Sequence, residues 1–175
     1  MSYSTYRKIK TLTTSTSQAS LDLTDIPQNY DDLVVKWSVQ STNSTRDQAF
    51  IKFNGTSANY IGQELRAYDG SNRNSTTSAT TSFDMNRIGG GTNFTDVFTN
   101  GEFYIPSYSG SSNKSVSFDF VLSTNATSGL REYLSLSAGL WSNTAAINQI
   151  TFTLSAGNFA ANSTVTIYGI KRGTA

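Results

Sequence analysis

The sequence contains no histidine and no cysteine, and only two of its 175 residues are proline. Without histidine or cysteine, the usual ligands of zinc, copper and haem iron are missing. Catalytic Ser-His-Asp and Cys-His arrangements are missing for the same reason. No disulfide holds the fold, so folding needs no oxidising compartment. The composition therefore points away from most enzymes, and we expect no catalytic residues and no cofactor.

Charge is also scarce, since 13 basic and 12 acidic residues give a net charge of +1. The basic residues are spread along the chain and form no patch that would follow a phosphate backbone. No run approaches the ~18 apolar residues of a membrane span. The polar N-terminus lacks the apolar core of a signal peptide. We therefore expect a protein made in a cytoplasm, with no nucleic-acid and no membrane partner.

Short segments that alternate apolar and polar residues fill the chain, joined by turns rich in Ser, Thr, Asn and Gly. In the clearest, residues 32–40, the side chains of Leu33, Val35 and Trp37 point one way. The alternation recurs in residues 116–122, 134–140, 150–154 and 165–167, where Leu134, Leu136, Ala138 and Leu140 form one apolar face. Further candidate strands are residues 5–13, 19–23, 48–54, 59–67, 80–88 and 101–106.

About ten short strands separated by turns predict an all-β fold, a single antiparallel β-sandwich of the jelly-roll kind over residues 5–175. Residues 68–80 are polar without alternation, and we expect a loop there. Residues 1–12 are either an edge strand of this sandwich or an arm that reaches a neighbouring subunit. In the second case the contacts to the partner would come from Tyr3, Tyr6, Arg7, Lys8 and Lys10.

Three kinds of site remain to be weighed. A pair of carboxylates could hydrolyse a glycoside, and the least turn-like candidates are Glu64, Asp96 and Glu102, but solvated surface carboxylates are the simpler interpretation. Calcium needs only oxygen ligands, yet the local clusters 31–32 and 69–72 match no known calcium loop and are typical of turns. We therefore expect no metal site, and the carboxylates are interpreted as surface groups.

A sugar site on a β-sandwich combines an aromatic ring with amide and carboxylate groups. Trp141, Asn143, Tyr104 and Tyr108 supply such groups and are the candidate glycan contacts. Trp141 directly follows the apolar face that ends at Leu140, which favours packing of these aromatic rings in the core or in a subunit interface.

Four strings of the sequence carry a family resemblance. They are YRKIKTLTTSTSQASLDLTDIPQNYDDLVVKWSVQS (6–41), FIKFNG (50–55), GEFYIPSYSGSSNKSVSFDFVLSTNAT (101–127) and SAGLWSNTAAINQITFTLSAGNFAANSTVTIYGI (137–170). In this order and spacing they resemble a family of small β-rich virion proteins of tailed bacteriophages, especially phages of aquatic bacteria. The resemblance spans nearly the whole chain and is weakest between residues 66 and 98. It implies a structural role and carries over no catalytic residue.

We therefore expect a non-enzymatic virion structural protein, synthesised in the host cytoplasm and located on the particle. A capsid decoration or cement protein fits best, a homotrimer that bridges and stabilises the shell of the major capsid protein. The alternative is a tail-fibre or baseplate adhesin that binds a host surface glycan. A third and more distant interpretation is a cellular carbohydrate-binding module.

Overall fold

The computed structural model describes residues 5–68, 71–91, 94–124 and 132–172, the side chains of residues 73–79 and 86 excepted. The described residues form twelve β-strands and no α-helix, which confirms the predicted all-β fold. The strands are β1 (Tyr6–Thr13), β2 (Ser20–Leu23), β3 (Asp32–Val39), β4 (Asp47–Phe53), β5 (Tyr60–Tyr68), β6 (Ser71–Thr80), β7 (Phe83–Ile88), β8 (Thr99–Pro106), β9 (Lys114–Leu122), β10 (Tyr133–Trp141), β11 (Ile150–Leu154) and β12 (Thr164–Ile170).

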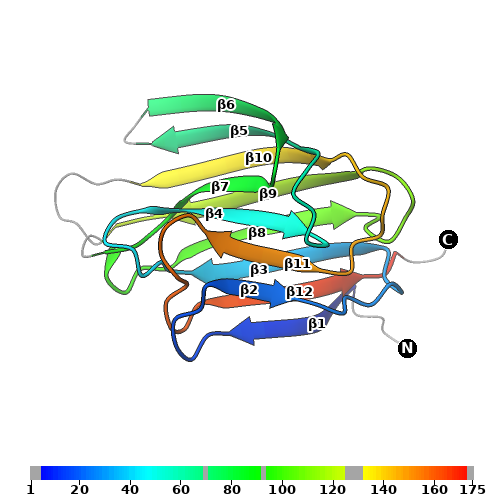
Figure 1. Ribbon diagram of the computed structural model, residues 1–175, viewed down its shortest axis with the longest axis horizontal. Helices are drawn as coiled ribbons and strands as arrows, with labels where there is room; N and C mark the ends of the chain where they lie inside the picture. Colours follow the sequence, from blue (N-terminus) through cyan, green and yellow to red (C-terminus); the bar gives the residue numbers. More distant parts are fainter. Residues whose placement is uncertain (1–4, 69–70, 92–93, 125–131, 173–175) are drawn as a thin grey trace.

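The strands form two antiparallel sheets of unequal size. The larger has eight strands in the order β1-β12-β3-β8-β9-β10-β5-β6, and the smaller has four in the order β2-β11-β4-β7. Figure 1 shows the smaller sheet in front of the middle of the larger one, while β5 and β6 continue beyond it at the top of the view. One end of the larger sheet therefore extends past the sheet that covers it.

The core lies between the two sheets and is rich in aromatic rings. Phe103 of β8 packs against Phe152 of β11 with 5.9 Å between ring centroids, which joins the sheets at their middle. Near β10, the ring of Phe53 on β4 lies 5.6 Å from the rings of both Trp141 and Phe83. Such edge-to-face pairs add to the free energy gained by burying the rings. The predicted apolar faces of β3, β9, β11 and β12 point into this core.

A buried carboxylate fixes the loops at one end of the sandwich. Asp47, at the start of β4, accepts hydrogen bonds from the hydroxyls of Ser41 (2.8 Å) and Ser155 (2.5 Å). It also accepts the backbone N–H groups of Gln48, Ala156 and Gly157 at 2.8, 3.2 and 2.8 Å. Burial raises the pKa of Asp47, but these hydrogen bonds outweigh it and the pKa is lowered. The Asp47 carboxylate therefore has a structural role: it accepts hydrogen bonds from five donors and stays ionised.

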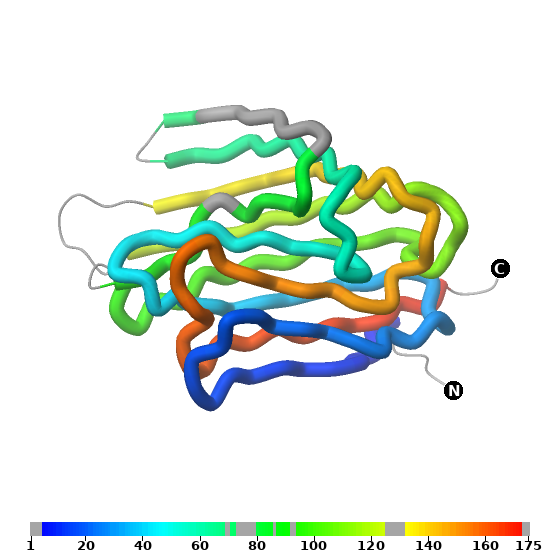
Figure 2. The backbone as a smooth tube through the Cα atoms, in the orientation of Figure 1, coloured from blue at the N-terminus to red at the C-terminus, as the bar shows by residue number. Residues whose placement is uncertain are grey.

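Of the segment expected as an edge strand or an arm, residues 6–12 belong to an edge strand, β1, and residues 1–4 lie outside the described part. β1 pairs with β12 along the edge of the larger sheet, with Tyr6 opposite Ile170 and Thr13 opposite Thr164. Figure 2 shows these two segments, the first and last strands of the chain, side by side. Of the expected partner contacts, Tyr6, Arg7 and Lys8 are exposed and Lys10 is half-buried, whereas Tyr3 lies outside the described residues.

The loop expected at residues 68–80 is wrong. Residues 71–80 form β6, which pairs with β5 from Tyr68 opposite Ser71 to Tyr60 opposite Thr80. A strand made almost wholly of Ser, Thr and Asn has no apolar alternation, so its sequence contains no strand pattern to detect. The strand forms because β5 offers its backbone N–H and C=O groups along that edge.

Candidate functional site

The apolar face predicted for β10 points away from the core. Leu134 and Leu136 lie on the outer face of the larger sheet and are exposed, while Ser135 and Ser137 are buried on the inner face. The leucines do share one face, as the alternation predicts, but this apolar face lies outside the core. The alternation was identified correctly, but period two gives no information on which face is covered.

The outer face over β9, β10 and β5 carries five large apolar side chains that are 40–61% exposed. We call this group the leucine face; its members are Ile61, Leu65, Val121, Leu134 and Leu136. Leu136 lies opposite Leu65 on β5, and Leu134 lies opposite Val121 on β9. Directly opposite residues on one face are close enough to touch, so Leu65, Val121, Leu134 and Leu136 adjoin one another, while Ile61 lies further along β5, opposite Leu140.

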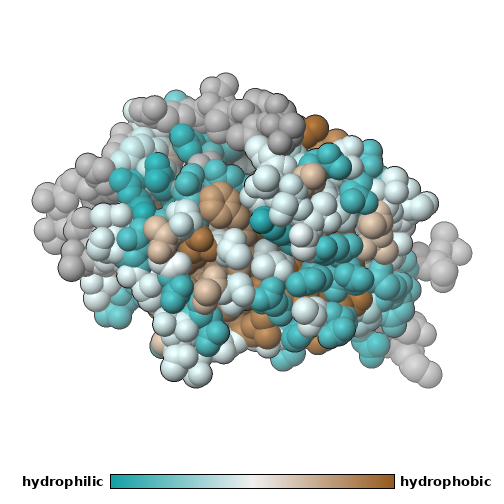
Figure 3. Space-filling view, viewed as in Figure 1, coloured by the Kyte–Doolittle hydropathy of each residue, from teal (hydrophilic) through white to brown (hydrophobic). Residues whose placement is uncertain are grey.

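The rest of the outer face is mostly polar, with one aromatic pair at the β1–β12 end: the rings of Tyr6 and Tyr168 lie 6.3 Å apart, and Tyr6 is 49% exposed. Lys36 of β3 and Glu102 of β8 form an exposed ion pair of 3.2 Å. Towards β1 the face carries threonines, including Thr11 and Thr166, whose hydroxyls lie 3.0 Å apart. Seen from the opposite side, over the smaller sheet, the surface mixes apolar with polar residues (Figure 3). The leucine face thus occupies only the β9–β10–β5 end of the larger sheet.

The inner face of the same strands holds charged and hydroxyl side chains. Ser135 donates to Glu64 Oε1 at 2.9 Å, and the hydroxyls of Ser135 and Ser137 lie 3.1 Å apart. Arg66, two residues along β5, forms a 3.3 Å ion pair with Glu64 Oε2. Here the larger sheet extends past β7, the last strand of the smaller sheet. The inward-facing side chains of β5 and β10 in this region are therefore polar at positions that would be apolar if another sheet covered them.

Two tyrosines close the same inner row. The rings of Tyr68 on β5 and Tyr133 on β10 are stacked, with centroids 4.2 Å apart. Arg46, in the loop before β4, donates to the Tyr133 hydroxyl at 2.7 Å and to the Tyr68 hydroxyl at 3.3 Å. Its guanidinium lies 5.2 Å from both ring centroids, within the range of cation–π attraction. These contacts tie the β3–β4 loop to β5 and β10.

Asp84 on β7 adds a second carboxyl group to this region. Burial, followed by the nearby charge of Glu64, raises the pKa of Asp84 to about 6, against the opposing effect of Arg87 and Arg66. Its Oδ2 lies 3.4 Å from the Gln48 amide nitrogen, and its buried Oδ1 has no hydrogen-bond partner. The Nε atoms of Arg66 and Arg87 are likewise buried without one. We call the side chains of this region the polar cluster. Its members are Arg46, Glu64, Arg66, Tyr68, Asp84, Arg87, Tyr133, Ser135 and Ser137.

The expected glycan contacts do not form a site. Trp141 and Tyr108 are fully buried, so their rings offer no surface on which a sugar could stack. The Tyr104 hydroxyl donates to Asp32 at 2.8 Å, and Asn143 Oδ1 accepts the backbone N–H of Ala145 at 2.8 Å. Trp141 packs in the core, one of the two places expected for it, but it does so because it lies on the face of β10 opposite Leu134 and Leu136.

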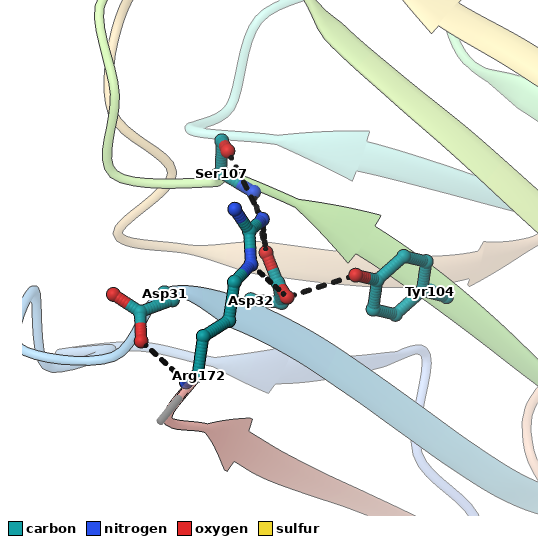
Figure 4. A network of polar contacts seen from close by, with 5 residues as sticks. All are labelled: Asp31, Asp32, Tyr104, Ser107 and Arg172. Atoms are coloured by element: carbon teal, nitrogen blue, oxygen red, sulfur yellow. Dashed lines mark hydrogen bonds and ion pairs between the residues drawn. The ribbon is translucent and has the colours of Figure 1, made fainter. Parts of the chain in front are cut away.

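The acidic residues weighed earlier have separate places. Asp32 is held by Arg172, the Tyr104 hydroxyl and the backbone N–H of Ser107, as Figure 4 shows, while Asp31 accepts the backbone N–H of Arg172. Burial raises the pKa of Asp32, but these hydrogen bonds outweigh it and lower the pKa. The network joins the end of β12 to β3 and β8. Of the other acidic cluster, residues 69–70 lie outside the described part.

Of the three carboxylates considered for hydrolysis, only Glu64 lies in the polar cluster. Glu102 pairs with Lys36 on the outer face, and Asp96 is an exposed turn residue with a φ of 59°. Among the described residues, no three His, Cys, Asp or Glu side chains gather in a way that could hold a metal ion.

Sequence reasoning missed most of the polar cluster, although part of it left a signal. Tyr60, Glu64, Arg66 and Tyr68 stand at even spacing along β5 and share one face. The buried Tyr60 could have indicated that the charged residues point inward with it. Arg46, Asp84 and Arg87 come from a loop and another strand, and no local pattern connects them to β5.

Comparisons with known proteins give the following result. No protein-family model matches the chain, and no curated protein matches it. Galectin LEC-6 of Caenorhabditis elegans is similar over 93% of this chain and 96% of its own, with 8% identity and a TM-score of 0.34. A structure of infectious bursal disease virus, Gx strain, is similar over 95% of this chain, with 12% identity and a TM-score of 0.14; the chain spans 41% of its length. Neither likeness bears on what this chain binds.

No helix within the described residues is long and apolar enough to cross a membrane.

Proposed function

We propose that this chain is a non-enzymatic structural protein of a bacteriophage particle, a decoration or cement protein that stabilises the shell as a homo-oligomer. The observation that carries the proposal is the leucine face. Five large apolar side chains that are about half exposed lie on the outer face of three neighbouring strands, β9, β10 and β5. Contiguous apolar patches of this kind mark interaction surfaces in proteins that are not membrane-bound.

The energetics support a multivalent role. Full burial of a Leu, Ile or Val side chain contributes roughly 1.5–3 kcal/mol. Side chains that are already half covered would contribute about half of that each, which is too little for one copy to bind tightly once the cost of association is subtracted. A protein present in many copies on a regular lattice needs no tighter binding per copy. Each copy binds only the assembled shell, so many weak contacts together shift the assembly equilibrium towards the shell.

The experiment is quantitative mass spectrometry of purified particles of the phage that encodes the chain. A ratio to the major capsid protein near one, or a simple fraction such as one third, is the expected result. A few to a few dozen copies per particle would place the protein on the tail or at a vertex. Complete absence from the particle would overturn the proposal.

A second measurement connects this role to the leucine face. The double variant Leu65→Ser, Leu136→Ser removes two side chains that lie opposite each other. Its matched control, Lys36→Ser with Glu102→Ser, changes an opposite pair on the polar part of the same outer face. On particles that lack the protein, the control should bind like the unaltered chain and the leucine variant should not. Equal binding of both variants would exclude the leucine face as the docking surface.

The polar cluster favours a second candidate, an adhesin that binds a host surface glycan. Guanidinium, carboxylate and phenol groups close together are the partners that sugar hydroxyls use. Arg46, Arg66 and Tyr68 are only partly buried, so they are the members to change. If Arg66→Ala abolishes binding to the purified host surface polysaccharide while Lys36→Ala does not, the adhesin becomes the preferred function. Unaltered particle docking by Arg66→Ala is expected for the decoration protein.

A further inference from the structure

Among the described residues the two sheets end in four edge strands, β1, β2, β6 and β7, and three of these carry features that discourage pairing with another chain. β1 is an edge of the larger sheet and bears Arg7, Lys8 and Lys10, with a register shift between Lys8 and Lys10. β2 has only four residues. β7 pairs with β4 across a second register shift, between Asp47 and Ala49. Positive charge, shortness and bulges are the usual means by which a protein protects its edge strands.

The fourth edge, β6, carries less of this protection: it has one positively charged residue, Arg73, and a register shift confined to its last four residues. With ten residues it is the longest of the described strands. Its sequence, SNRNSTTSAT, has one charged residue and no lysine or proline. The shift in its pairing with β5 lies between Tyr60 and Gly62, and from Gly62 opposite Thr77 to Tyr68 opposite Ser71 the register is unbroken. A regular, nearly uncharged backbone edge is therefore left without a neighbouring strand among the described residues.

The leucine face lies at this same end of the sheet. It spans β9, β10 and β5, and β5 is the neighbour of β6. The protected edge, β1, lies instead beside the polar part of the outer face. Two independent features, a long backbone edge with little protection and an exposed apolar face, therefore coincide at one end of the larger sheet.

We propose that β6 pairs antiparallel with β6 of a second copy of this chain, so that two eight-stranded sheets become one sheet of sixteen strands. We favour a second copy as the partner because a two-fold axis brings the same strand of two copies together. The two β6 strands, each nearly uncharged, can then form all the inter-strand hydrogen bonds between them. For two identical antiparallel edge strands, this axis stands perpendicular to the sheet. It therefore keeps the outer faces of both copies on the same side.

The consequence for docking rests on the proposed function. The leucine faces of the two copies would lie on one surface, separated by the paired β6 strands, and would present twice the apolar area to the particle. The pairing itself stands independently of where the protein acts. It also replaces the three-fold symmetry expected from the sequence with a two-fold.

The first experiment measures the mass of the isolated protein by analytical ultracentrifugation. We expect a dimer, and we expect Thr76→Lys in β6 to reduce the mass by half, to that of a single 19.0 kDa chain. The matched control, Thr13→Lys, adds the same charge to the opposite edge of the same sheet and should leave the dimer intact. A monomeric or trimeric unaltered protein, or a Thr76→Lys variant that stays dimeric, would overturn the proposal.

The second experiment uses the absence of cysteine and does not depend on whether the lysine variant folds. Single cysteines are introduced at each position from 71 to 77, and at position 13 as the control. On a two-fold axis one residue lies opposite its own copy, within the Cα separation of about 4.4–6.8 Å that a disulfide requires. Oxidation should join two chains at one or two neighbouring positions and not at position 13. Crosslinking at none of the seven positions would contradict the pairing.

The two experiments separate the inference from the proposed function. A protein that is absent from particles but crosslinks through β6 would leave the dimer standing and remove the virion role. A protein abundant on particles that fails to crosslink would do the reverse.

Discussion

The Ser135 hydroxyl donates a 2.9 Å hydrogen bond to Glu64 inside the sandwich, at a position where an apolar side chain would normally face the core. Both residues are buried, whereas Leu134 and Leu136 on either side of Ser135 face solvent. From Glu64 to Arg66 on β5 and from Ser135 to Ser137 on β10, polar side chains therefore face inward and apolar side chains face outward. This reversal produces both the polar cluster and the leucine face, on which the proposed assembly role depends.

Two substitutions on β10 test the reversal directly. Leu136→Ser should change the free energy of unfolding by no more than about 0.5 kcal/mol, because the side chain is exposed. Trp141→Ala, on the other face of the strand, should lower it by about 3–5 kcal/mol, because the ring is fully buried beside Phe53 and Tyr60. Urea denaturation at low protein concentration measures both. A loss at Leu136 as large as that at Trp141 would show that the leucines belong to the core.

Asp84 should make part of the stability depend on pH. Its pKa in the folded protein is about 6, above the ordinary value of 3.8, because burial disfavours the charged form. Ionisation therefore costs folding free energy that grows as the pH rises from about 4 to about 6 and then stays constant. Asp84→Asn should accordingly stabilise the protein near neutral pH and leave its stability below about pH 4 unchanged. A stability difference that does not vary with pH would contradict this assignment.

Asp47 should act in the opposite direction. Its pKa is lowered in the folded protein because hydrogen bonds outweigh the effect of burial. The stability it contributes is therefore complete above its ordinary pKa of 3.8 and is lost as the pH falls through the lower folded value. Asp47→Ala leaves the donors of the loops without an acceptor, and it should cost about 3 kcal/mol near neutral pH. Thermal unfolding measured from neutral pH to below 3.8 should show that the loss of unfolding free energy caused by Asp47→Ala becomes smaller in acid.

The ion pair of Arg172 with Asp32 should matter more than that of Lys36 with Glu102. Asp32 is buried, and Arg172 joins it to the end of β12 through hydrogen bonds from Nε and Nη2. Arg172→Ala should lower the free energy of unfolding more than Lys36→Ala does, because it leaves the buried Asp32 carboxylate without two of its hydrogen bonds. Lys36→Ala breaks a pair whose side chains are both about half exposed, and should cost about 0.5 kcal/mol. Similar losses in chemical denaturation would indicate that burial of Asp32 has no effect on the strength of its pair.

Much of the fold could be predicted from alternation alone. In β3, the side chains of Leu33, Val35 and Trp37 are buried as their spacing indicated. The same holds for Phe118 and Phe120 on β9. These strands lie in the middle of the larger sheet, where one face is covered by the smaller sheet, so the usual rule of apolar inside and polar outside applies.

The candidate site could not be predicted in the same way. β6 has no alternating pattern, and it becomes a strand because β5 pairs with it. The polar cluster joins side chains of β5, β7 and β10 with a loop residue, Arg46, that lies 87 positions before its partner Tyr133. Contacts between such distant positions depend on strand order, and the two sheets here connect strands that are far apart in the chain.

The sequence by itself determined an all-β chain without disulfides or histidine chemistry, and it determined which residues of each apolar strand share a face. Only the tertiary structure decided which of the two faces is covered. The smaller sheet ends at β7 while the larger continues through β10, β5 and β6. Strand periodicity is a local property of the backbone, whereas burial depends on what packs against the strand, and here that differs between the two ends of one sheet.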